Sequence, residues 1–343
     1  MGIYTALDGD SIDDKIERDL QHIVDRLKTM PFVQEIILGG GFGRGEGSVL
    51  INEQGVRPVN DYDIFIVVQD NSQFDFKPLA KELASELSMR LIDLIPIKYS
   101  NLKSLPPNQF NYDLKYGGRH LWGEDLRDLI PAYEEGIIDE GAGRTLLLNR
   151  LICAIEAFSD KFVKGTMNTE ETFFLVNQTC KVVSACVEAL LIKKGKYHYS
   201  YRTRHEIIGT VFPEKTRLLF LNKRATEFKL RPTVTPDFDA LQFWKETIHE
   251  YIEVLAFYFA PTSAAPYRGL WRRLQKNGSF PCSPVERVEM MLLLNKKASL
   301  FMKKRILSQA RKELEGLTKI SVPNNRWETL REITAGLWHE LHH

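Results

Sequence analysis

Residues 36–68 read IILGGGFGRGEGSVLINEQGVRPVNDYDIFIVV, and this stretch decides the fold. The hydrophobic residues Ile36–Leu38 predict a strand that runs into a glycine-rich turn at residues 39–45. Asp61 and Asp63 stand at the head of a second apolar segment. Because residues i and i+2 of a strand point to the same face, we expect the two carboxylates to project together. Paired carboxylates beside a glycine turn are typical of a site for Mg²⁺ bound to a polyphosphate.

The flanking sequence predicts a small mixed α/β unit. Ser11 is a candidate N-cap, followed by acidic first-turn residues, for a helix that reaches about Thr29. We expect strands at 33–38, 62–68 and 90–97, a helix at 77–88, and another strand or a hairpin within 109–122. The segment Val49–Val59 is expected to form a hairpin or loop that turns at Gly55.

Beyond Gly141 the spacing of apolar residues becomes helical. Intervals of three and four predict helices at 143–164, 170–194, 237–260, 285–315 and 325–341. Gly195 and Gly316 are candidate helix ends, and Pro236 and Pro284 are candidate starts. The predicted fold class is therefore α+β, with a mixed-sheet domain over residues 1–135 and an all-helical domain over 136–343. A sub-boundary is expected near residue 264, before the basic C-terminal helices.

Composition is that of a soluble globular protein, with 343 residues, 43% hydrophobic and 27% charged. The four cysteines form no CxxC pair, which favours a reducing compartment over a disulfide framework. The apolar stretches 182–192 and 252–260 are too short or too charged for a bilayer span. We therefore expect a cytoplasmic protein without a membrane span.

The net charge of +1 conceals an uneven distribution along the chain. Residues 1–150 hold 16 Lys and Arg against 25 Asp and Glu, whereas residues 264–320 hold 13 Lys and Arg against 4 Glu. A basic segment of this kind fits an anionic partner such as phosphate groups or nucleic acid. The alternative is a solvated helix face, and no aromatic residues are interleaved as in a base-stacking surface. Nucleic acid is therefore not the favoured partner.

The predicted strand at 90–97 carries a third acid, Asp93, among apolar neighbours. A carboxylate there is costly to bury unless it binds a metal or another partner, such as a nearby Lys or Arg. With Asp61 and Asp63 it completes a set of three carboxylates on adjacent strands. Such a set can hold two divalent ions, one bound to a triphosphate and one that lowers the pKa of an attacking hydroxyl.

The order of these motifs resembles the nucleotidyltransferase superfamily, whose folds include the DNA polymerase β palm. Gly40 and Gly41 match the glycine pair of that family, and the run Gly41–Glu46 is similar to its GSxxRGE form. Asp61-Tyr62-Asp63 matches the acid–hydrophobic–acid triplet, and Asp93 matches the third carboxylate. The resemblance covers residues 30–125 and implies that Asp61, Asp63 and Asp93 are catalytic and bind Mg²⁺ or Mn²⁺.

Two features depart from the family pattern. Gly41 stands where a serine is common, which removes a hydroxyl but keeps the backbone N–H donor. The gap between Gly41 and Asp61 is longer than usual, because of the insert at 49–59. A dinucleotide-binding turn is the main rival, since GGGFGRG contains G-x-G-x-x-G-like spacings. The acid doublet that heads a strand fits metal binding better.

The glycine turn and Arg44 are expected to bind phosphate oxygens. In the helical part, residues 181–204 resemble the second-domain segment of small-molecule-type nucleotidyltransferases. By that resemblance Lys181 contacts the triphosphate, and Tyr197, Tyr201 or Arg204 lines the nucleotide or acceptor pocket. The alternative is that Lys181 is a surface residue and the tyrosines are packing residues.

Together these features predict a Mg²⁺-dependent nucleotidyltransferase that moves a nucleoside monophosphate from an NTP to an acceptor hydroxyl and releases pyrophosphate. A small-molecule or sugar-like acceptor is favoured. The alternatives are a nucleotide second-messenger synthase and a protein AMP-transferase. A further alternative, from another class, is a non-catalytic nucleotide-binding regulatory or antitoxin-like protein.

Overall fold

The computed structural model describes residues 2–53, 55–276 and 280–342, which divide into two compact units. The first unit runs up to Asp139 and also includes Lys194–Ile207 and Thr226–Thr233. The second contains Glu140–Lys193, Ile208–Ala225 and the chain from Val234 onward. The chain thus first leaves the sheet-containing unit close to the predicted boundary at 135, and then returns to it twice.

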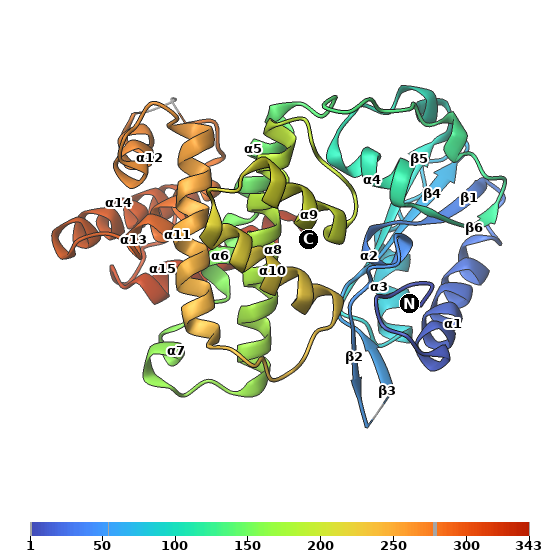
Figure 1. Ribbon diagram of the computed structural model, residues 1–343, viewed down its shortest axis with the longest axis horizontal. Helices are drawn as coiled ribbons and strands as arrows, with labels where there is room; N and C mark the ends of the chain where they lie inside the picture. Colours follow the sequence, from blue (N-terminus) through green and yellow to red (C-terminus); the bar gives the residue numbers. More distant parts are fainter. Residues whose placement is uncertain (1, 54, 277–279, 343) are drawn as a thin grey trace. The chain divides into compact units, whose positions relative to one another are not determined.

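A four-stranded mixed sheet forms the centre of the first unit (Figure 1). Its strands are β1 (Val33–Leu38), β4 (Tyr62–Val68), β5 (Ile92–Lys98) and β6 (Arg119–Gly123), in the order β5-β4-β1-β6. β1 is antiparallel to both β4 and β6, whereas β4 and β5 are parallel. The predicted strands at 33–38 and 62–68 are confirmed, and the one predicted at 90–97 begins two residues later.

Two apolar clusters cover the two faces of this sheet. On one face α1 (Asp10–Leu27) and α3 (Lys77–Glu86) pack against Ile36, Leu38 and Ile64. On the other, Leu114 of α4 (Gln109–Gly117) and the 3₁₀ turns η1 (Tyr99–Ser104) and η2 (Arg127–Leu129) flank a cluster that contains Ile37, Phe65 and Val67. Alternate residues of each strand therefore feed opposite core layers.

The prediction of a strand or hairpin over 109–122 is wrong for most of that segment. The side-chain oxygen of Asn108 accepts a hydrogen bond from the backbone N–H of Asn111, and this N-cap begins α4. The strand β6 starts only at Arg119. A similar displacement occurs at α1, whose N-cap is Gly9, so that Ser11 lies inside the helix.

The insert between the glycine turn and Asp61 forms a hairpin of β2 (Val49–Asn52) and β3 (Gly55–Pro58). It follows α2 (Gly40–Gly43), a single helical turn. Asn52 pairs with Gly55, so the reversal comes just before Gly55, where φ is 111°. Residue 54 lies outside the described residues.

The second unit is helical, as expected, but its helices are shorter and more numerous than predicted. The segment 143–164 divides into three helices, and 285–315 divides into two. Three further helices, α9, α10 and α12, were not predicted. The helices of this part of the chain are α5 (Glu140–Asn149), α6 (Leu151–Glu156), α7 (Asp160–Lys164), α8 (Thr169–Lys193), α9 (Tyr201–Val211), α10 (Thr216–Leu230), α11 (Ala240–Phe259), α12 (Pro266–Gln275), α13 (Pro284–Asn295), α14 (Leu300–Thr318) and α15 (Trp327–His342).

The helix boundaries show which of the predicted start and end residues do begin or end a helix. Pro284 is the first residue of α13, and Ser283 and Glu286 form a capping box around it. Gly195 follows α8 with φ of 66°. Gly316 lies inside α14, which ends instead at Lys319, a residue with φ of 59°. Asp239, and not Pro236, caps α11.

The helix α8 is long and apolar enough to cross a membrane by length and composition. Of its most hydrophobic 18-residue window, 83% is buried inside the structure, as happens for the central helix of a bundle. Its neighbours are α5, α6 and α11. No membrane is needed to cover this surface, because the other helices already do so.

Glu289 is an acid in the middle of the helical core. It lies on α13, its exposed fraction is 0%, and neither carboxylate oxygen has a hydrogen-bond partner among the described residues. Burial, reinforced by Glu286 and Glu156, raises the pKa of Glu289 to about 8. Near neutral pH the carboxyl group is therefore mostly protonated.

Replacing Glu289 by Gln is expected to flatten the pH dependence of stability. The folded-state pKa of about 8 lies above the ordinary glutamate pKa of 4.5, so the folded chain holds this proton more tightly than the unfolded chain does. The free energy of unfolding should therefore fall as the pH rises from 4.5 to 8. At pH 8, close to the raised pKa of Glu289, Glu289→Gln should be about 2 kcal/mol more stable than wild type in urea unfolding.

The matched control is Glu340→Gln on α15, because Glu340 is exposed. This variant should keep the wild-type pH profile. Equal pH profiles for wild type and Glu289→Gln would contradict the assignment.

Candidate active site

Two of the three predicted carboxylates lie side by side at one end of the sheet. β4 and β5 run parallel, and Asp63 is the register partner of Asp93. Both residues stand at the second position of their strands, and paired positions of neighbouring strands project to the same face. This face also carries Phe65 and Val67, which belong to the core layer under α4.

The electrostatics of Asp63 link it to the other two acids. Burial, together with the charges of Asp61 and Asp93, raises the pKa of the Asp63 carboxyl to about 7, and Arg44 opposes this shift. The three carboxyl groups are therefore close enough to repel one another when ionised. No hydrogen bond or ion pair joins the side chains of Asp61 or Asp63 to another side chain in the part of the chain that is described.

The glycine turn lies directly against Asp63. The N–H of Gly39 donates to the backbone oxygen of Asp63 over 2.7 Å, which ties the end of β1 to the start of β4. Gly40 has φ of 58°, and a Cβ placed on it would stand 1.8 Å from Oδ2 of Asp63. Only glycine leaves room for the carboxylate at this position. A Cβ placed on Gly41, by contrast, would stand 3.3 Å from its nearest neighbour, the backbone oxygen of Glu46.

Arg44 lies in a buried network, with 6% of its side chain exposed. Its Nε donates to Oε2 of Glu46 over 3.0 Å, and its Nη1 lies 3.5 Å from Oδ2 of Asp113. Its guanidinium also stacks on the ring of Tyr201, with 4.6 Å between Cζ and the ring centroid. The predicted contact of Arg44 with phosphate stays a prediction, and in this structure its charge is balanced by two acids of the same unit.

Glu46 joins the glycine turn to a segment more than 150 residues away in sequence. Its Oε1 accepts from Ser200 Oγ at 2.7 Å and from the N–H of Arg202 at 3.2 Å. Its Oε2 accepts from the N–H of Tyr201 at 2.8 Å, in addition to Arg44. The carboxylate therefore caps the first turn of α9 from outside that helix.

In the segment at residues 197–204, which returns to the first unit, the predicted pocket residues Tyr197 and Arg204 form hydrogen bonds with other groups of that unit. The hydroxyl of Tyr197 donates to Oδ1 of Asp113 over 2.8 Å. Arg204 is 3% exposed, and its Nη1 donates to the carbonyl oxygens of His198 and Tyr199 over 2.7 and 2.8 Å. These residues fix the shape of the segment at residues 197–204, beside the turn that carries Arg44.

The remaining predicted site residue, Lys181, does not lie in the first unit. Lys181 is on α8 in the second unit, so the geometry of the first unit does not include it. Sequence reasoning assigned no role to Glu46, Asp113 or Ser200. The acid two residues after Arg44 was the only signal for Glu46, and no local signal existed for the other two.

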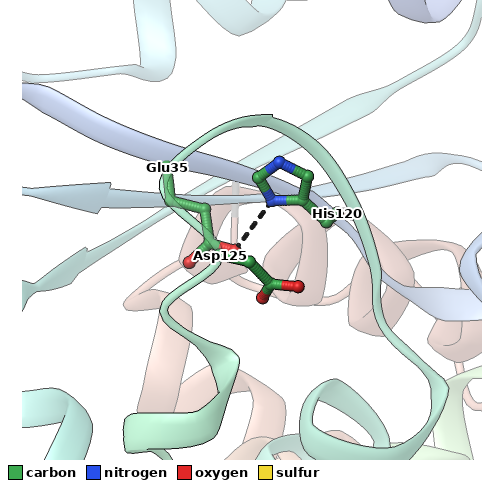
Figure 2. Close-up of side chains that lie close together, drawn as sticks. All are labelled: Glu35, His120 and Asp125. Carbon is green, nitrogen blue, oxygen red and sulfur yellow. Dashed lines mark hydrogen bonds and ion pairs between the residues drawn. The ribbon is translucent and has the colours of Figure 1, made fainter.

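A second polar cluster lies on the same sheet, farther from the glycine turn (Figure 2). Glu35 of β1, His120 of β6 and Asp125 place their candidate ligand atoms within 4.8 Å of one another. Oε1 of the buried Glu35 lies 3.2 Å from Nδ1 of His120, and its Oε2 accepts from the N–H of Leu126 over 3.1 Å.

The partners of this cluster favour an anchor over a metal centre. Arg127 donates to both oxygens of Asp125, over 2.8 and 2.5 Å, and lowers the pKa of that carboxyl to about 2. Burial raises the pKa of Glu35, and the bonds from His120 and Leu126 oppose this shift. These hydrogen bonds hold the chain after β6 against the sheet, and both oxygens of Asp125 are already paired with Arg127.

Gly40→Ala should destabilise the first unit far more than Gly41→Ser. The alanine would require positive φ and would collide with the Asp63 carboxylate, so we expect a loss of about 2–4 kcal/mol in denaturant unfolding. Gly41→Ser needs a shift of only a few tenths of an ångström and should cost less than about 1 kcal/mol. Equal stability of the two variants would be incompatible with this packing.

Glu46→Gln should release the returning segment. A single amide oxygen cannot replace a carboxylate that accepts from Arg44, Ser200, Tyr201 and Arg202. We expect a loss of about 2–4 kcal/mol and faster hydrogen exchange at residues 200–204. The control Glu53→Gln changes an exposed residue of the insert and should match wild type in both measurements. Unchanged exchange in Glu46→Gln would show that the segment is held by other contacts.

The site therefore consists of a glycine turn, three acids that repel one another, and a buried ion network behind the turn. No protein-family model, curated protein or solved structure matches the chain in the comparisons with known proteins.

Proposed function

We propose that the protein is a Mg²⁺-dependent nucleotidyltransferase that transfers a nucleoside monophosphate from an NTP to an acceptor hydroxyl. The observation that carries this proposal is the contact of Gly40 with the carboxylate of Asp63, which is itself paired in register with Asp93. The resemblance of residues 30–125 to the nucleotidyltransferase superfamily points in the same direction. The mixed sheet of this protein agrees with that superfamily at the level of an α+β fold.

The residues present suit a hard divalent cation. Asp61, Asp63 and Asp93 offer only oxygen donors, which Mg²⁺ and Mn²⁺ prefer. The raised pKa of Asp63 reflects burial and like charges nearby, and a bound cation would relieve both costs. In this proposal the ion supplies charge neutralisation to the phosphates and lowers the pKa of the acceptor hydroxyl.

The proposed reaction is an in-line displacement at the α-phosphorus. The acceptor oxygen forms a new bond to that phosphorus, while the bond to the oxygen bridging the α- and β-phosphates breaks. Pyrophosphate leaves with the electron pair, and Asp93 is the candidate to receive the hydroxyl proton. The glycine turn allows the phosphates to approach the backbone closely, and positioning supplies much of the rate.

Arg44 takes a different part in this proposal from the one that its sequence position implies. With Glu46 and Asp113 on either side, it orients the glycine turn and the segment at residues 197–204. Nucleotide contacts of Tyr197, Tyr201, Arg204 and Lys181 remain part of the proposal as predictions. A small-molecule or sugar-like hydroxyl is the proposed acceptor class.

The test is incubation with Mg²⁺ and each NTP, labelled in parallel at the α- or the γ-phosphate, with and without a fraction of small metabolites. Nucleotidyl transfer should place the α label on a product and the γ label in pyrophosphate. Asp61→Ala should lower the rate by about 10³-fold or more, because it removes a ligand of the ion that neutralises the phosphates. The control Asp14→Ala, at an exposed position of α1, should retain wild-type activity.

The other outcomes identify the rival functions. Label on the protein itself indicates an AMP-transferase, and a labelled nucleotide oligomer or cycle indicates a second-messenger synthase. Binding of Mg²⁺-NTP without any product would favour a regulatory protein and overturn the catalytic proposal. A γ label on the product would show phosphoryl transfer instead.

A further inference from the structure

The first turn of α14 carries the two most exposed large hydrophobic side chains among the described residues. Leu300 and Phe301 are each 77% exposed. The buried residues of α14 begin later, at Ile306, and continue with Ala310 and Leu314. The helix is thus held to its neighbours from its second turn on, and its apolar beginning is left in solvent.

The surroundings of this apolar pair are strongly basic. Between residues 296 and 312 the chain has seven Lys and Arg and no Asp or Glu. Lys297, Lys304 and Arg305 are exposed, whereas the amine of Lys296 lies over the rings of Phe158 and Trp327 and is not part of the surface. Asp160 and Glu328 are the acids that act on Lys296 from other elements. We name Lys297, Leu300, Phe301, Lys304 and Arg305 the basic apolar tip.

Helix geometry places these side chains in two layers. Lys304 lies one turn behind Leu300, and Arg305 one turn behind Phe301, on the same faces of α14. One turn is about 5.4 Å along the axis, and helical side chains lean toward the N-terminus. Leu300 and Phe301 therefore lie nearest the N-terminal end of α14, and the charged groups of Lys304 and Arg305 lie just behind them along the helix axis.

We propose that the basic apolar tip binds the surface of an anionic lipid bilayer. An apolar pair in front would reach the acyl chains of a bilayer, while the basic layer behind it would lie level with the anionic headgroups. The positive end of the helix dipole adds to the attraction. A nucleic acid would also attract the charges, but it offers no partner for an exposed Leu next to the Phe. This inference does not depend on the proposed enzymatic function.

The test is flotation of the full-length chain with vesicles of phosphatidylcholine alone or with ~30% phosphatidylserine. The chain should float with the anionic vesicles, and about tenfold less with neutral vesicles or at ~0.5 M salt. Leu300→Ser/Phe301→Ser should weaken binding by about tenfold or more, as should Lys304→Glu/Arg305→Glu. These positions are exposed, so the variants should retain the thermal unfolding midpoint of wild type.

The matched control is Ile320→Ser, which removes an exposed apolar side chain, 69% exposed, just beyond the other end of α14. It should leave flotation unchanged. Absence of flotation, equal binding to neutral vesicles, or an equal loss in Ile320→Ser would overturn the proposal. So would binding of single-stranded RNA that depends on Lys304 and Arg305 but not on Leu300 and Phe301. A dimer in vesicle-free solution that Leu300→Ser/Phe301→Ser dissociates would assign the tip to self-association instead.

Discussion

The carboxylate of Glu46 is the contact on which the arrangement of the first unit depends. It neutralises a buried arginine and satisfies three donors at the start of α9. Each of these groups would be costly to bury alone, since a charge or a backbone N–H without a partner loses its hydration and gains nothing. The glycine turn and the returning segment therefore stabilise each other, although Glu140–Lys193 of the other unit lies between them along the chain.

The candidate active site is under the opposite kind of constraint. Where the Glu46 network balances charge, Asp61, Asp63 and Asp93 bring like charges together, and the absence of a side chain at Gly40 allows it. Such a site is less stable without a ligand than it would be with apolar residues, which is common where structure is retained for binding or chemistry. The balanced network lies directly behind the unbalanced one, with Arg44 acting on both. The ion network around Glu46 thus holds the glycine turn in place against the repulsion between the three carboxylates.

The pattern of neighbouring residues in the sequence was enough to predict the two central strands of the sheet. The strands at 33–38 and 62–68 were predicted to the residue, because apolar runs bounded by glycine and aspartate have few alternatives. The prediction over 109–122 failed because one cap, Asn108, outweighed a pattern that also fits a strand. The surroundings of Arg44 were beyond any local argument, since its partners Asp113 and Tyr201 lie 69 and 157 residues away. A glycine turn that precedes an arginine looks like a phosphate site whether or not distant acids already surround that arginine.

The order in which the first unit is built has a consequence for its synthesis. Ser200 to Arg202 and the stretch Thr226–Thr233 belong to this unit, and Ser48 donates a hydrogen bond to the carbonyl oxygen of Lys229. A ribosome that has released only the first 139 residues has produced the whole sheet, but not the groups that satisfy Glu46. Glu46 must therefore wait for Ser200–Arg202, about sixty residues further on, and the unit is complete only when Thr226–Thr233 has also emerged. Parts of the helical unit, Glu140–Lys193 and Ile208–Ala225, are synthesised between the segments of the first unit. The two units are therefore expected to complete their folding together and not one after the other.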